Sequence, residues 1–173
     1  MQHVFLIHAH KDIDQLNALI ELLCDPDFLI YVHLDRNSGI DPAALHPRAR
    51  QVRARVAVRW GTVSQVRASL ASLRQILLEA PAFDKLVFLS GQDYPLLPNA
   101  LLKTELARLH GSELIETAPI APGGWPVMRR YQYFHREGGG ALEQLACRLA
   151  NGVLILLGRT RRFPDGLAPY GGS

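Results

Sequence analysis

The chain has 173 residues, 48% hydrophobic and 20% charged, with a formal net charge of +3, which is ordinary for a soluble globular domain with a sizeable core. The longest late apolar run, residues 153–157, is far too short to span a bilayer, and two cysteines without a CxxC pair make no disulfide framework. The basic excess is local and lacks an aromatic-plus-basic binding motif, so nucleic acid is not an expected partner.

The first half of the chain alternates strands and helices. An apolar run predicts a central strand over residues 3–9, and apolar positions at helical spacing predict an amphipathic helix over 12–24. A second buried strand is expected at 28–34. Residues 36–50 are rich in Asn, Ser, Gly, Pro and Asp and predict a loop with one helical turn. Residues 55–58 are expected to form a short third strand.

The same alternation continues to about residue 117. We expect helices over residues 63–77, 98–109 and 141–157, and strands over 84–89 and 113–116. This order predicts an α/β fold with a mostly parallel, Rossmann-like sheet and flanking helices, formed by one domain over residues 1–173. The chain has neither a GxGxxG nor a GxxxxGK[ST] motif, so a dinucleotide Rossmann site and a P-loop are not supported.

Polar or aromatic residues stand at the carboxyl ends of all five predicted strands. They are His8 and His10, His33 and Asp35, Trp60, Asp93, and Glu116. In a parallel sheet these ends share one edge, which is where ligands bind to open α/β sheets. Five strands out of five favour a site at this edge over a chance arrangement.

Two chemistries could use these strand-end residues. One is a metal site for a metal-dependent hydrolase, built on His8, His10, His33, Asp35 and Asp93. The other is a nucleotide site, in which Asp35 accepts hydrogen bonds, Trp60 stacks on a base and Asp93 faces a sugar. The simpler alternatives are a core aromatic for Trp60, a turn cap for Asp35, and for Asp93 a tight turn that caps backbone amides.

Four segments also match one known family in order and spacing. They are IHAHK at residues 7–11, YVHLDR at 31–36, RWGTVS at 59–64 and FLSGQDYPL at 88–96. With these segments the chain resembles the core-2/I-branching enzymes of glycosyltransferase family 14, and above all their bacterial members. The family contains β-1,6-N-acetylglucosaminyltransferases and peptide O-xylosyltransferases.

The resemblance implies a GT-A-like fold and an inverting transfer of GlcNAc or xylose from a UDP-sugar donor to the hydroxyl of a glycan or other acceptor. It implies no cofactor and no divalent metal. The residues that match the family's donor contacts are Ile7, His8, Asp35, Arg59, Trp60, Gly91 and Gln92. Asp93, on the loop that lines the sugar pocket, is the catalytic candidate. The region that meets the acceptor or donor sugar matches Glu116, Arg129, Arg130 and Tyr131.

The family continues beyond a segment that resembles Gly171, Gly172 and Ser173. In the family the downstream part supplies basic residues for the diphosphate and, in the core-2 enzymes, the glutamate base. The resemblance therefore implies the amino-terminal part of a longer transferase domain, with a non-catalytic nucleotide-binding fragment as an alternative. For a bacterial source it implies a cytoplasmic location, with peripheral association to the inner membrane as a variant.

Overall fold

The computed structural model describes residues 1–80, 82–114, 118–119, 133–134, 140–159 and 170–171. Its contacts divide the chain into two compact units, Met1–Ser112 and Glu113–Ser173. The single-domain organisation stays a prediction.

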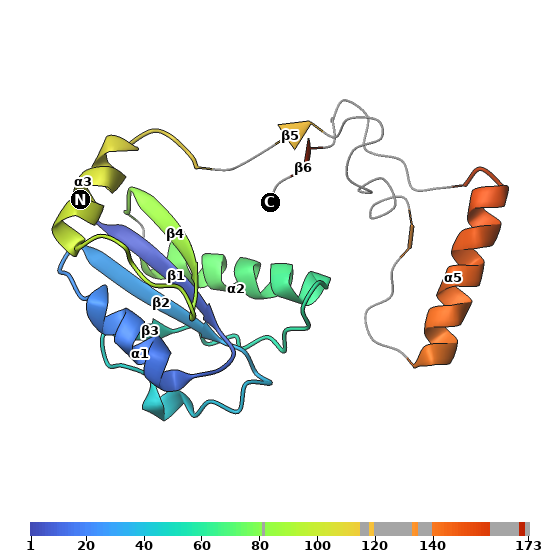
Figure 1. Ribbon diagram of the computed structural model, residues 1–173, viewed down its shortest axis with the longest axis horizontal. Coiled ribbons are helices and arrows are strands. Elements are labelled where there is room, and N and C mark those ends of the chain that lie inside the picture. The colour runs from blue at the N-terminus through green and yellow to red at the C-terminus, as the bar shows by residue number, and fades with distance from the viewer. Residues whose placement is uncertain (81, 115–117, 120–132, 135–139, 160–169, 172–173) are drawn as a thin grey trace. The chain divides into compact units, whose positions relative to one another are not determined.

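The first unit contains a four-stranded parallel sheet with the strand order β3-β2-β1-β4 (Figure 1). The strands are β1 (His3–Ala9), β2 (Phe28–Leu34), β3 (Ala49–Gln51) and β4 (Lys85–Ser90). β1 is central and pairs along its length with β2 on one side and β4 on the other. Its near-continuous run of apolar residues fits this position, because a strand between two neighbours in a covered sheet is buried on both faces.

Three helices and one helical turn accompany the sheet. They are α1 (Ile13–Leu22), α2 (Val63–Glu79), α3 (Asn99–Arg108) and the 3-10 turn η1 (Pro42–Ala44). The side chain of Asp12 caps α1 by accepting the Gln15 N–H, and Thr62 caps α2 by accepting the Ser64 N–H. The predicted helices over 12–24, 63–77 and 98–109 are thus confirmed to within a few residues.

Side-chain alternation along the strands builds one core on each face of the sheet. On one face Phe5 and Ile7 of β1 pack with Leu16 of α1 and Leu106 of α3. The opposite face of the sheet has its own core, which includes even-numbered residues of β1. Its buried members are Val4, Leu6, Tyr31, Val52, Ile76 and Ala80. The predicted α/β fold with a parallel sheet and flanking helices is therefore confirmed, and it is consistent with a GT-A-like fold.

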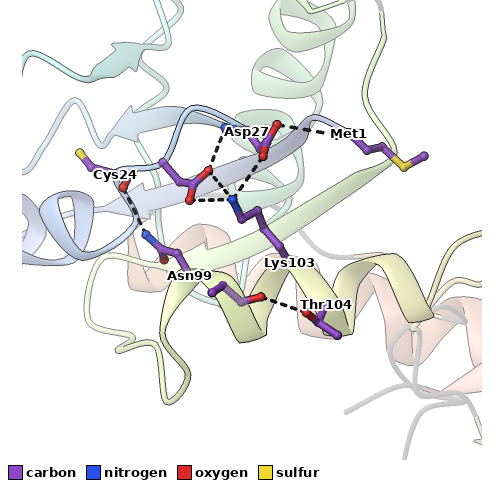
Figure 2. A network of polar contacts seen from close by, with 8 residues as sticks. Met1, Cys24, Asp27, Asn99, Lys103 and Thr104 are labelled. Carbon is purple, nitrogen blue, oxygen red and sulfur yellow. Dashed lines mark hydrogen bonds and ion pairs between the residues drawn. The ribbon is translucent and has the colours of Figure 1, made fainter.

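A polar network fixes α3 to the amino edge of the sheet (Figure 2). The Lys103 Nζ lies 3.0 Å from a carboxylate oxygen of Asp25 and 3.3 Å from one of Asp27. Asn99 donates its side-chain N–H to the Cys24 carbonyl over 3.2 Å. The hydrogen bonds to the carboxylates of Asp25 and Asp27 raise the pKa of Lys103. The pKa of Asp25 is lowered, mainly by a hydrogen bond from the backbone N–H of Asp27 and to a smaller extent by Lys103.

The predicted third strand is wrong. Residues 55–58 form no strand, and the third strand is β3, which lies several residues earlier. The backbone of residues 55–58 bonds instead to side chains at the end of β2. The other two buried strands, at 3–9 and 28–34, are confirmed, and the strand expected at 84–89 begins and ends one residue later.

The second unit contains α5 (Ala141–Leu156) and a two-stranded antiparallel pair of β5 (Ala118–Pro119) and β6 (Tyr170–Gly171). The helix predicted over 141–157 is confirmed. Of the strand expected at 113–116, residues 113–114 are not in a strand and the other two lie outside the described residues. No helix in the described part of the chain has the length and apolar character needed to cross a bilayer.

Candidate functional site at the carboxyl edge of the sheet

The carboxyl ends of three strands meet in register. His8 of β1 lies between His33 of β2 and Ser90 of β4. α2 begins at the same edge, because a helix that connects two parallel strands runs back across the sheet in the opposite direction. The structure thus brings together three of the four segments that carry the family resemblance, and α2 starts within the fourth.

Two neutral histidines lie side by side at this edge. The rings of His8 and His33 have centroids 4.8 Å apart, and the ring of Phe88 lies 4.6 Å from that of His8. Burial, and after it the His33 ring, lowers the pKa of His8 to about 4, and burial is also the main cause that lowers the pKa of His33. The Nε2 of His8 is buried and has no hydrogen-bond partner among the described residues.

Asp35 follows β2 and is only 8% exposed. Its Oδ1 accepts the backbone N–H of Asn37 over 2.9 Å and that of Val58 over 3.1 Å. Within the described residues no hydrogen bond reaches its second oxygen, Oδ2. Asp35 is therefore a turn cap through one oxygen, and a nucleotide hydroxyl could still bind to the other. That contact stays a prediction.

A tight turn before α2 presents Trp60 to solvent. The Arg59 N–H donates to the Ser64 Oγ over 2.8 Å, the Thr62 Oγ1 donates to the Arg59 carbonyl over 2.8 Å, and Gly61 has a φ of 73°. Trp60 is 92% exposed, so it is not a core aromatic residue. Arg59 is exposed as well. An indole held open on a capped turn is suited to stack on a planar ligand.

The loop after β4 is a closed turn. The Asp93 N–H donates to the Ser90 carbonyl over 3.0 Å, and the Ser90 N–H donates to the Asp93 Oδ2 over 2.7 Å. Gly91 is buried, and its N–H donates to the His8 carbonyl over 2.8 Å. Gln92 is exposed and accepts the side-chain N–H of Gln15 over 3.2 Å. Asp93 thus caps its own turn and leaves an exposed carboxylate next to the end of β1.

Several predicted site residues lie elsewhere. Ile7 is fully buried in the core beside α1, and its backbone is paired on both sides, so its side chain supports the edge from beneath and does not line it. Glu116, Arg129, Arg130 and Tyr131 lie outside the described residues. Sequence reasoning missed Phe88, whose place follows from the period of two in β4: Phe88 sits opposite Leu6, on the sheet face that His8 shares.

The histidines and carboxylates at this edge do not form a metal-binding group among the described residues. The His33 Nε2 already accepts a backbone N–H from Val56. Three potential ligands converge only elsewhere in the described part, at Glu21, Cys24 and His46. There the His46 Nδ1 accepts the Arg48 N–H, so Nε2 carries the proton and donates to Glu21 over 2.8 Å. That group is a hydrogen-bonded link from α1 to the loop after η1.

Comparison with known proteins shows the family of this chain. The family model described as Branch: Core-2/I-Branching enzyme matches residues 3–133. A protein of Danio rerio, beta-1,3-galactosyl-O-glycosyl-glycoprotein beta-1,6-N-acetylglucosaminyltransferase 4, is 25% identical over 117 residues, which cover 64% of this chain and 27% of the relative. The chain therefore spans about a quarter of the length of this curated relative. Because the family model covers well over half of the residues, the chain belongs to the Core-2/I-branching enzyme family.

Proposed function

We propose that this chain carries the nucleotide-sugar-binding part of a glycosyltransferase that uses a UDP-sugar and inverts the anomeric centre. The observation that carries the proposal is the meeting of the family-matching segments at one edge of the sheet. There a buried His8 Nε2 without a partner in the described part of the chain and an exposed Trp60 accompany the turn closed by Asp93. Ligands of open α/β sheets bind at this edge.

The donor would be bound without a glycine-rich phosphate loop. We assign the hydrogen bonds with uracil or ribose to the His8 ring and to Asp35 Oδ2, and Trp60 offers a stacking surface for the base. Gly91 and Gln92 bring the loop with Asp93 towards the donor sugar. This assignment combines hydrogen bonding to the ligand's edge with stacking on its face, which is how proteins commonly recognise a nucleobase.

The transfer itself needs two further functions. A base has to remove the proton of the acceptor hydroxyl, and positive charge has to stabilise the leaving diphosphate. We assign the positive charge to arginine or lysine side chains, in a reaction without a divalent metal. Glu116, Arg129, Arg130 and Tyr131 remain the candidates for the acceptor region.

The donor sugar is proposed to be GlcNAc. The Danio rerio relative is named as a β-1,6-N-acetylglucosaminyltransferase, and the similarity to that relative favours GlcNAc over xylose. The acceptor is proposed to be a glycan hydroxyl.

Thermal unfolding with UDP tests the donor part of this proposal. Millimolar UDP in the presence of EDTA should raise the melting temperature, because a ligand that binds only the folded state stabilises that state. ADP is the matched control for the base, and it should shift the melting temperature less. A shift that requires added Mn²⁺ would overturn the metal-free part alone, and no shift in a folded sample would overturn UDP binding. Release of GlcNAc from UDP-GlcNAc, compared between this chain and longer versions, then reports turnover.

A further inference from the structure

Residues 55–58, just before Trp60, have a strand-like sequence, but side chains and not a neighbouring strand accept two of their backbone N–H groups. The Val56 N–H donates to the Nε2 of His33 over 3.0 Å, and the Val58 N–H donates to the Oδ1 of Asp35 over 3.1 Å. The Val56 carbonyl accepts the N–H of Arg36 over 3.2 Å. Residues 56–58 therefore bond to the end of β2 mainly through two of its side chains.

The spacing explains why the two side chains suffice. His33 and Asp35 are two residues apart and point to the same face of the sheet, and alternate N–H groups of an extended segment also point in one direction. Both repeats are about 6.6–6.8 Å long. A His-x-Asp pair can therefore match the N–H groups of Val56 and Val58 one to one, and it takes the place of a backbone ladder.

Arg55 closes the same contact from the adjacent position. Its Nε donates to the Leu34 carbonyl over 3.2 Å and its Nη2 donates to the Asp35 carbonyl over 3.1 Å. The two acceptors are the last residue of β2 and the residue that follows it, so the segment is fixed at Arg55, Val56 and Val58. The path of the chain is set just before it reaches Arg59 and Trp60.

The contact at His33 requires a particular protonation state. A ring nitrogen that accepts an N–H must carry a lone pair, so the proton of the neutral ring is on Nδ1, and an imidazolium could not accept the bond. The buried side chain of His33 lies beside the ring of His8, and burial lowers its pKa. The charge of Asp35 opposes this shift and the charge of Arg55 adds to it. Because the pKa remains lowered overall, the ring is neutral at neutral pH.

We propose that His33 is a positioning residue of the donor site: its neutral Nε2, together with Asp35, holds residues 55–58 in the path that presents Trp60 to the nucleotide. The ligand in this statement rests on the proposed function. The role differs from the metal-ligand role that the His-x-Asp pattern also allowed, because the Nε2 lone pair is used by the Val56 N–H. It also gives Asp35 a second task besides any contact to the donor.

Amide hydrogen exchange tests the positioning without any ligand. In the wild-type chain the Val56 amide should be protected, and the ¹⁵N shifts of His33 should show the Nδ1–H tautomer. His33→Phe removes the acceptor and should speed Val56 exchange by about tenfold. His33→Gln keeps an oxygen near the position of Nε2 and should retain the protection. The control His46→Phe removes another ring nitrogen that accepts a backbone N–H, from Arg48, and should leave Val56 unchanged.

UDP affinity, measured by calorimetry, tests the consequence for the donor site. His33→Phe should weaken UDP binding by about three- to tenfold, whereas His33→Gln and His46→Phe should stay within about twofold. Wild-type affinity should fall as His33 becomes protonated in acid, and His33→Gln should remove this part of the pH dependence. An unprotected Val56 amide, or equal weakening by Phe and Gln, overturns the proposal.

The two proposals fail in different ways. If the wild-type chain binds no UDP, the donor assignment fails, while Val56 exchange still decides whether His33 holds the segment. If His33→Phe does not fold, the pH dependence of Val56 exchange in the wild-type chain decides the same point. Protection that disappears as His33 is protonated supports the contact, and protection that does not respond overturns it.

Discussion

Gly91 lies against Ala9 with no space for a side chain between them. A Cβ built on Gly91 would lie 2.9 Å from the Cβ of Ala9 and 3.6 Å from the His8 carbonyl oxygen. The Gly91 N–H donates to that same oxygen over 2.8 Å. The loop after β4 is thus pressed onto the end of β1, and this close approach, not a left-handed φ, accounts for the glycine.

Replacing Gly91 by alanine should therefore destabilise the chain. Forcing a methyl group into a packed contact costs about 1–3 kcal/mol, so Gly91→Ala should lower the free energy of unfolding by that amount in denaturant titrations. Ala9→Gly removes the nearest atom, and the double variant should recover part of the loss. Additive losses in the double variant would show that the contact between the two residues is not the cause.

Trp60→Ala should separate binding from stability. The side chain is almost fully exposed, so the free energy of unfolding should change by less than about 0.5 kcal/mol. Loss of a base-stacking surface costs about 1–3 kcal/mol, so the affinity for UDP should fall by about fivefold or more. Trp60→Phe keeps an aromatic face and should retain most of the affinity. A large loss of stability with unchanged UDP affinity would contradict the assigned role.

Asp93→Asn should weaken donor handling more than folding. The amide oxygen can still accept the Ser90 N–H, so the turn survives and the free energy of unfolding should change by less than about 1 kcal/mol. The negative charge that we propose to face the donor sugar is lost, and UDP-GlcNAc binding should weaken. The matched control is Asp41→Asn, another exposed aspartate that accepts a backbone N–H, from Ala43. Wild-type affinity for UDP-GlcNAc in Asp93→Asn would overturn the role given to Asp93.

The stability of the chain should fall in mild acid because of His8. In the unfolded chain His8 has a pKa near 6.5. In the folded chain burial lowers the pKa of His8 to about 4. The contribution of neutral His8 is therefore complete above pH 6.5 and is lost as the pH falls from there to about 4. Each such histidine contributes at most about 1.4 kcal/mol per pH unit, and the lowered pKa of His33 acts in the same direction.

His8→Phe tests this assignment. It removes the titrating group but keeps a ring against Phe88, so the acid dependence of the denaturant midpoint should become shallower. An unchanged slope would assign the acid sensitivity to other groups.

Lys103→Met should loosen α3 from the amino edge. The substitution removes the ammonium group between Asp25 and Asp27 while it keeps much of the aliphatic chain (Figure 2). The denaturant midpoint should fall, since the largely buried carboxylate of Asp25 loses its cation, whereas Asp27 keeps an ion pair with the amino terminus of Met1. The control is Arg108→Met, which removes an exposed pair with Glu105 on the same helix and should change stability by less than about 0.5 kcal/mol. Equal effects of the two variants would contradict the importance of this network.

Local sequence patterns predicted the elements whose partners are also local or periodic. β1, β2 and α2 follow from apolar runs, helical spacing and the cap at Thr62. The prediction of a third strand over residues 55–58 is wrong for a physical reason. Residues 55–58 contain valines in an alternating pattern, but two of their N–H groups donate to side chains at the end of β2 and just after it, and no local pattern reveals such partners. β3 is a short, partly exposed edge strand of Ala, Arg and Gln, which has little strand propensity.

The position of the candidate site could be predicted better than its contacts. A parallel sheet places all strand ends on one edge, so the grouping of His8, His33 and Asp35 followed from topology alone. The contacts depend on which atoms are already engaged. Asp35 Oδ1 and His33 Nε2 both accept backbone N–H groups from a distant segment, and only the folded chain shows that these two atoms are engaged and that the buried His8 Nε2 has no partner among the described residues.

The strand order has a consequence for how the protein is made. β1 lies between β2 and β4, yet the ribosome completes β2 about fifty residues before β4, a delay of roughly 3–10 s at about 5–20 residues per second. During that interval one hydrogen-bonding edge of β1, a strand of buried apolar residues, has no partner. Until the residues of β4 have left the exit tunnel, the nascent chain therefore exposes an apolar strand with one unpaired edge, to which chaperones or neighbouring nascent chains can bind.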